Sequence, residues 1–242
     1  CGDFKIHTFT GPGTFTVTCA GNPLGSDKID YLVVAGGGGG IGQYSGGGAG
    51  GHRFAFHLGS PSPSPFNAPA CESARTVTAQ AYPITIGAGG APTPTSPSAS
   101  GRIAGKGGDS VAGLITSAAG GTPNGDTGYG PPNTSADNQA LRDGGSGAGG
   151  GHQYSYPVGA GNVPPTSPPQ GNPAGPGNGT WGASGGGGAS GAGASSGSNA
   201  YSSPGGAGGA GTSSSITGAS VCRAGGGGGG AFVAGGSGGP AS

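Results

Sequence analysis

Large apolar side chains are scarce in this sequence. Leu, Ile, Val and Phe together supply 29 of its 242 residues, about 12%. A chain below roughly 20% cannot bury a large apolar core, even when it is long enough for one or two domains. The long Leu, Ile and Val periodicity of a Rossmann fold, a TIM barrel or a helix bundle is missing. No apolar run approaches the roughly 18 residues that a membrane-spanning helix needs.

Charge is scarce as well. Charged residues make up 7% of the chain, with eight basic and eight acidic side chains and a formal net charge of zero. Such a chain cannot neutralise a phosphate backbone, which argues against binding DNA or RNA through charge. The acidic residues are scattered, Glu72 is the single glutamate, and no acid–base pair stands out. We therefore expect no enzyme activity, no cofactor and no metal site.

The four cysteines are Cys1, Cys19, Cys71 and Cys222, and they lack the CxxC spacing of a zinc site. An even number of cysteines in a chain with much backbone entropy favours two disulfides and an extracellular setting. Of the three possible pairings we favour Cys1–Cys19 together with Cys71–Cys222. Free, buried thiols are the alternative, and an N-terminal cysteine can also be a site of lipid acylation.

The first third of the chain carries nearly all of the strand signal. Residues 4–9 and 14–19 flank a Gly-Pro-Gly turn, and the second segment alternates apolar residues with threonines, which predicts a β-hairpin. Residues 29–35 are apolar on both faces after Tyr31 and predict a central strand that is covered on both sides. Further strands are expected at residues 53–58, 75–79, 82–86 and 111–115.

Glycine supplies 66 residues and proline 22, and after about residue 118 the apolar residues stand isolated between glycine blocks. Such blocks either form flexible linkers or adopt the polyproline-II type helix of polyglycine. That helix has three residues per turn and no internal hydrogen bonds, so its main-chain groups can bond to neighbouring rods. We divide the chain into a β-rich part, 1–118, with the first rods, and a glycine-rich part, 119–242, which together form one continuous structural unit.

Several segments resemble the glycine-rich domain of bacteriophage tail proteins. They are residues 6–10 and 13–17, the run DYLVVAGGGGG at 30–40, YPITIGAGG at 82–90, and residues 167–172 and 215–230. The hairpin followed by YLVVAGGGGG is the specific part. The resemblance to tail-fibre adhesins of the polyglycine-II sandwich type implies packed polyglycine-II helices with variable loops that meet the host receptor. The expected fold is therefore β-rich with little helix: an N-terminal β-hairpin and small β-layer, then packed polyglycine-II helices with long irregular loops.

Polyglycine rods offer no side chains, so recognition is expected in the segments that connect them. Aromatic rings in such segments bring a large contact area at a small cost in rotamer entropy. The receptor-contact candidates are Tyr129, His152, Tyr154, Tyr156, Trp181 and Tyr201. Capping of the rod ends is the alternative role for each ring. Trp181, the single tryptophan, is the strongest candidate.

These observations favour a non-enzymatic structural or receptor-binding module of a phage tail appendage, on the virion or otherwise extracellular. Its expected partners are a host cell-surface receptor, either a saccharide or an outer-membrane protein, other tail subunits, and further copies of the chain. The alternative is a self-assembling subunit of an extracellular filament or sheath, joined through exposed backbone edges. In that case Asn133 and Asn178, which stand in N-glycosylation sequons, could carry sugar.

Overall fold

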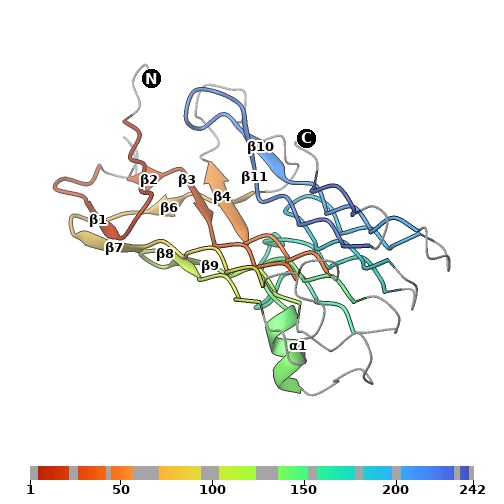
Figure 1. Cartoon of the computed structure of the whole chain (residues 1–242). Coiled ribbons are helices and arrows are strands. Elements are labelled where there is room, and N and C mark those ends of the chain that lie inside the picture. The colour runs from red at the N-terminus through yellow and green to blue at the C-terminus, as the bar shows by residue number, and fades with distance from the viewer. Residues whose placement is uncertain are drawn as a thin grey trace.

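The structure, a computed structural model, describes residues 5–21, 27–41, 45–56, 71–93, 104–123, 136–151, 157–177, 182–197, 203–231 and 235–239. Over these ranges the chain is β-rich and contains a single helix, as the composition predicts. The strands gather toward one end of the molecule, and the glycine-rich segments run side by side toward the other end (Figure 1).

The strands form small open sheets. The largest sheet has the order β1-β7-β8-β9 and is antiparallel throughout, with strands Gly13–Thr16, Ala81–Thr85, Ser110–Ala112 and Ile115–Ser117. A second sheet has the order β3-β4-β5, with strands Tyr31–Val34, His52–Phe56 and Glu72–Ser73. Two further pairs are β2 with β6, Lys28–Ile29 and Arg75–Thr76, and β10 with β11, Thr212–Ser214 and Val221–Arg223.

The apolar core is small and lies between the two larger sheets. Tyr31 and Val33 of β3, Ala55 of β4 and Ile115 of β9 form one buried cluster, with Ala112 of β8 packed against it. A cluster of this size buries too little apolar area to hold a chain of this length together by itself. Most of the fold must therefore be stabilised in another way.

The predicted N-terminal hairpin is wrong. Residues 5–9 form no strand, and β1 pairs instead with β7, more than sixty residues later. This pairing places Phe15 opposite Tyr82, with ring centroids 6.2 Å apart. The N-terminal segment folds back over β1 through side chains alone, and the His7 ring meets the Phe15 ring edge-on at 5.2 Å. The ring contacts of β7 outweigh the short sequence separation that favours a hairpin.

The predicted central strand at residues 29–35 lies at an edge. It is divided at Asp30 into β2 and β3, and β4 is the middle strand of the β3-β4-β5 sheet. Its continuous apolar character arises because one face of β3 also packs toward β8 and β9. The strands expected near residues 53–58 and 82–86 are confirmed as β4 and β7, whereas the one expected at 75–79 is reduced to the two residues of β6.

Residues 111–115 form a turn with strands on both sides instead of one strand. Gly113 has a φ of 59°, a left-handed conformation that glycine adopts without strain, and it joins β8 to β9. The β10–β11 pair and the helix α1, Ala136–Arg142, were not predicted. In the described ranges no helix has the length and apolarity required to cross a bilayer.

Seven strands are directly preceded or followed by segments dominated by Gly, Ala and Ser, which we call glycine tracts. These are tracts 35–41 after β3, 45–51 before β4, 86–93 after β7, 104–109 before β8, 118–123 after β9, 203–211 before β10 and 224–231 after β11. Six more tracts are 144–151, 157–161, 170–177, 182–188, 191–197 and 235–239. All of them run alongside one another (Figure 1).

Main-chain hydrogen bonds join the tracts laterally, and the pattern repeats every three residues. The amides of Gly36 and Gly39 donate to the carbonyls of Gly108 and Gly105 at 3.0 and 2.9 Å. The residues between them form lateral main-chain hydrogen bonds with other tracts in the same way. Each tract therefore presents polar groups in several directions, which neither a β-strand with its two-residue period nor an α-helix does.

Tract 182–188 lies at the centre of this arrangement and is buried over its whole length. Its amides donate to three tracts, 144–151, 191–197 and 224–231. Its carbonyls accept from three others, 45–51, 170–177 and 203–211. Six tracts thus surround it, and the main chain itself forms the interior of the molecule.

This packing leaves no room for side chains along much of the tracts. A Cβ placed on Gly186 would lie within 3.0 Å of three backbone atoms, the carbonyl carbon and oxygen of Gly47 and the amide nitrogen of Gly48. Real Cβ atoms do not approach backbone this closely. Glycine is therefore required here by the close approach of neighbouring main chains, at negative φ.

Candidate functional site

The stack of tracts has two distinct ends. At one end, the strand end, tracts meet the β-strands. At the other, which we call the loop end, Ile41 pairs with Ser45 and forms a bridge to Thr93, and Gly182 forms a bridge to Ala231. Tracts 191–197 and 203–211 also meet there, since Gly197 donates to Pro204 and both Ser196 and Pro204 lie beside Gly182.

All six predicted receptor-contact residues, Tyr129, His152, Tyr154, Tyr156, Trp181 and Tyr201, lie outside the described residues, as do Asn133 and Asn178. The tracts that precede them in the chain end at the loop end. Ser184 donates to Gly150, and the hydroxyl of Thr122 donates to Gly39, which fixes where tracts 144–151 and 118–123 end. The chain therefore leaves the stack at the loop end before each of the segments that contain these candidates.

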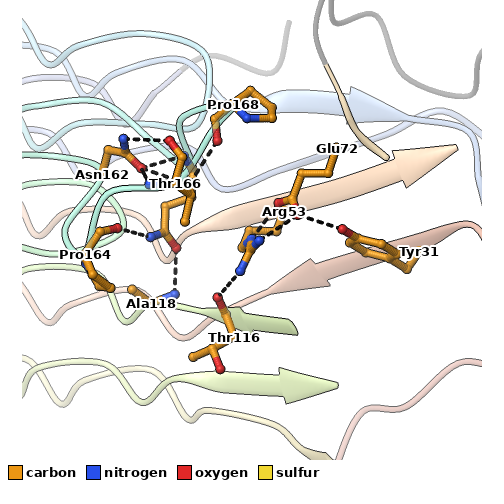
Figure 2. A network of polar contacts seen from close by, with 10 residues as sticks. Tyr31, Arg53, Glu72, Thr116, Ala118, Asn162, Pro164, Thr166 and Pro168 are labelled. Atoms are coloured by element: carbon orange, nitrogen blue, oxygen red, sulfur yellow. Dashed lines mark hydrogen bonds and ion pairs between the residues drawn. The ribbon is translucent and has the colours of Figure 1, made fainter. Parts of the chain in front are cut away.

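At the strand end, a charged clamp joins four strands. The guanidinium of Arg53 on β4 donates from Nε and Nη2 to the two carboxylate oxygens of Glu72 on β5, at 2.5 and 2.6 Å (Figure 2). Its Nη1 donates to the carbonyl of Thr116 on β9 at 2.9 Å, and the Tyr31 hydroxyl donates to Glu72 at 2.7 Å. Burial, together with the adjacent Glu72, raises the pKa of Tyr31 to about 12. The clamp therefore holds together β4 and β5, the strands that come before and after residues 57–70 in the chain.

A second polar network, also in Figure 2, centres on Gln170, which is 1% exposed. Its Oε1 accepts from the Ala118 amide at 2.8 Å, and its Nε2 donates to the Pro164 carbonyl at 2.8 Å. The Asn162 side chain accepts from the amides of Thr166 and Gln170. This network closes the turn between tracts 157–161 and 170–177 with side-chain bonds in place of an apolar core.

His52 is a buried titratable residue, 4% exposed. It is the first residue of β4 and directly follows tract 45–51. Burial, with a smaller contribution from the charge of Arg223, lowers the pKa of His52 to about 4. No described residue forms a hydrogen bond with its Nε2. The imidazole is therefore neutral at physiological pH and is held by its burial and by the edge of the Phe54 ring, 5.4 Å away.

Acidification is expected to destabilise the fold through His52. Its pKa is depressed on folding, so its contribution is complete above pH 6.5 and is lost as the pH falls toward 4, by up to roughly 3 kcal/mol. The unfolding free energy of the wild type minus that of His52→Gln, measured by urea denaturation, should shrink over this range. A difference that stayed flat over this range would show that His52 is not buried in its neutral form.

A family profile described as glycine-rich domain matches residues 9–242. The chain belongs to the glycine-rich domain family. No significant match is found among curated proteins or among solved structures.

The cysteines of this glycine-rich domain do not pair as predicted. Cys71 and Cys222 both have free thiols, so the Cys71–Cys222 disulfide is not formed. Cys71 stands directly before β5, whereas Cys222 pairs with Ser213 in the β10–β11 sheet and its sulfur lies over Gly211. Cys19 is a free, exposed thiol, and its predicted partner Cys1 lies outside the described residues.

Sequence reasoning missed the clamp and the buried histidine of the glycine-rich domain. The signal for the clamp was the single glutamate of the chain, placed directly after a Pro- and Ser-rich segment and within reach of an arginine-containing strand. The signal for His52 was its position between a glycine block and an aromatic strand. Among the described residues, no group of three or more metal-ligating side chains occurs.

Proposed function

We propose that this glycine-rich domain is a non-enzymatic structural and receptor-binding module of a phage tail appendage, on the virion or otherwise extracellular. The observation that carries the proposal is the division of the stack into two ends. The chain leaves the tracts at the loop end before every segment that contains a receptor-contact candidate. A saccharide or an outer-membrane protein of the host would bind there.

The glycine tracts are polyglycine-II helices in this proposal. The three-residue repeat of the lateral hydrogen bonds supports this assignment, because the polyproline-II conformation has three residues per turn and leaves all main-chain groups free to bond outward. The six neighbours of tract 182–188 support it as well. The described glycines with left-handed φ, Gly113 and Gly218, both lie in turns between strands. Among the described tract residues, Ala224 has a left-handed φ, of 58°, and it stands at the start of its tract, directly after β11.

Such a scaffold suits receptor binding because it separates stability from sequence variation. The tracts are held by main-chain hydrogen bonds, so the connecting segments can change without altering the interior. Binding surfaces are commonly carried by loops on a rigid framework for the same reason. The aromatic residues of these segments supply the contact area that small polar residues lack.

Replacing Trp181 with alanine is expected to weaken binding of the labelled domain to host outer-membrane vesicles by more than about tenfold, since buried tryptophans are frequent hot spots. Leu114→Ala is the matched control, because Leu114 is 88% exposed and lies in a turn at the strand end. Thermal unfolding should be unchanged in both variants. Unchanged binding by Trp181→Ala would count against its role, and helical filaments of the purified chain would favour the filament subunit instead.

A further inference from the structure

A groove of about 630 Å³ runs along the stack, and main chain forms almost its entire lining. Residues 45–49 of tract 45–51 form its floor. Tract 35–41 forms one wall, and tracts 224–231 and 235–239 form the other. Both wall tracts that flank the floor hydrogen-bond to it, since Gly38 donates to Gly48 and Gly227 donates to Gly47, each at 2.9 Å.

The floor tract has one neighbour fewer than the central tract. Hydrogen bonds join it to five tracts: 35–41, 118–123, 144–151, 182–188 and 224–231. Successive members of this ring are themselves hydrogen-bonded to each other, except that no described bond joins tract 35–41 to tract 224–231. The groove lies between these two tracts, at the position where the central tract has its sixth neighbour.

Some main-chain amides of the floor tract also lack a hydrogen-bond acceptor among the described residues. Its carbonyls accept from three tracts. Apart from Ser45, which pairs with Ile41 at the loop end, its donating amides bond to two tracts: Gly48 and Gly51 to tract 118–123, and Ala49 to tract 182–188. In the described part of the chain, nothing accepts from the amides of Gly47 and Gly50. Three-residue spacing places these two amides on one face of the tract.

The walls place these amides on the groove side. A Cβ on Gly40 would lie 3.8 Å from the Gly47 nitrogen, and a Cβ on Gly37 would lie 3.8 Å from the Gly50 nitrogen. From the opposite wall, a Cβ on Gly227 would lie 3.1 Å from the Gly47 nitrogen. The Gly47 amide therefore lies between the two walls, and the Gly50 amide lies beside the Gly37 wall, next to the residues that line the groove.

The walls present the complementary groups. The carbonyls of Gly38 in one wall, and of Gly225 and Gly228 in the other, accept no main-chain hydrogen bond from any described residue. Around the central tract, donor and acceptor neighbours are equal in number. A strand in the groove would continue that pattern by accepting from the floor and donating to both walls.

We infer that this groove binds an extended, glycine-rich strand of a partner polypeptide, which occupies the vacant sixth position beside tract 45–51. Glycine is needed because the floor and walls are main chain and approach as closely as the tracts approach one another. The strand comes from another protein and not from a second copy, because every described tract of this chain already bonds to its neighbours and would have to leave its own stack. This inference does not depend on receptor binding at the loop end.

Titration of the isotopically labelled chain with a lysine-flanked heptaglycine peptide tests the inference by amide NMR. We expect the largest shifts at Gly47 and Gly50, together with slowed hydrogen exchange at both amides. A lysine-flanked heptaalanine peptide should not bind, because its methyl groups would meet main chain on three sides.

Two variants place a methyl group over the floor amides. Gly37→Ala fits in ordinary van der Waals contact, whereas Gly40→Ala requires the Ser45 carbonyl to move by a few tenths of an ångström. Gly37→Ala and Gly40→Ala bring the new Cβ no closer than 3.5 and 3.3 Å to any described atom. Each should weaken peptide binding by about tenfold, the equivalent of roughly one hydrogen bond. Gly89→Ala is the matched control, since its Cβ has 3.9 Å of clearance and Gly89 does not line the groove.

Three results would overturn the inference. The first is the absence of shifts at Gly47 and Gly50 at millimolar peptide, and the second is equal binding of the heptaalanine peptide. The third is a shift of the same amides with protein concentration alone, which would assign the groove to a second copy. Loss of receptor binding in Trp181→Ala would leave the groove titration unchanged, so the two proposals fail separately.

Discussion

Gly186→Ala is expected to destabilise the protein by at least about 3 kcal/mol, at or above the upper end of the usual cost of overpacking. The new Cβ would lie within 3.0 Å of three backbone atoms of Gly47 and Gly48. A flexible side chain could rotate away from such a contact, but these atoms belong to a tract that is itself hydrogen-bonded to five others. Relief would require moving two tracts apart and breaking several lateral bonds.

Gly89→Ala provides the control for the Gly186 variant. Gly89 is exposed, its φ is not left-handed, and the nearest described atom would be 3.9 Å from the new Cβ. Alanine also lowers the entropy of the unfolded chain, so this variant should be neutral or more stable by up to about 1 kcal/mol. Urea denaturation of both variants measures the difference. Equal stabilities would mean that the tracts are not packed against one another.

Glu72→Gln is expected to cost about 3 kcal/mol, because it leaves the Arg53 guanidinium largely buried without its counter-charge. The two side chains are 14% and 8% exposed, so water cannot replace the lost carboxylate. The substitution should also loosen Tyr31 and Thr116, because their hydrogen bonds to Glu72 and Arg53 connect β3 and β9 to the clamp. Chemical denaturation gives the free energy, and hydrogen exchange in β5 reports the local effect.

Two further variants separate the effect of an unpaired buried charge on stability from the effect of lost packing. Tyr31→Phe removes one hydrogen bond to the carboxylate and should cost about 1.5 kcal/mol, less than the glutamate substitution. The double variant Arg53→Met with Glu72→Leu removes both charges and should recover much of the loss, because apolar pairs often replace buried ion pairs without penalty. A double variant less stable than Glu72→Gln alone would contradict this account of the clamp.

Local patterns predicted those features that depend on neighbours in sequence. The alternation in β4 and β7 and the turn-forming residues around them were sufficient to place both strands near their observed bounds. The same reasoning failed for the N-terminal hairpin, since the partner of β1 was chosen by the Phe15–Tyr82 contact across the sheet. The clamp was equally inaccessible, because Arg53 and Glu72 meet through parallel pairing of β4 and β5.

What the sequence alone determined is the kind of interior this protein can have. With 66 glycines and so few large apolar residues, it could not bury a large apolar core, and its main-chain groups had to find partners in each other or in water. Only the tertiary structure decided which tract lies beside which. Glycine blocks carry no side chains to specify a neighbour, so the choice of neighbours is made by the strands that hold each tract and by the register of its lateral hydrogen bonds.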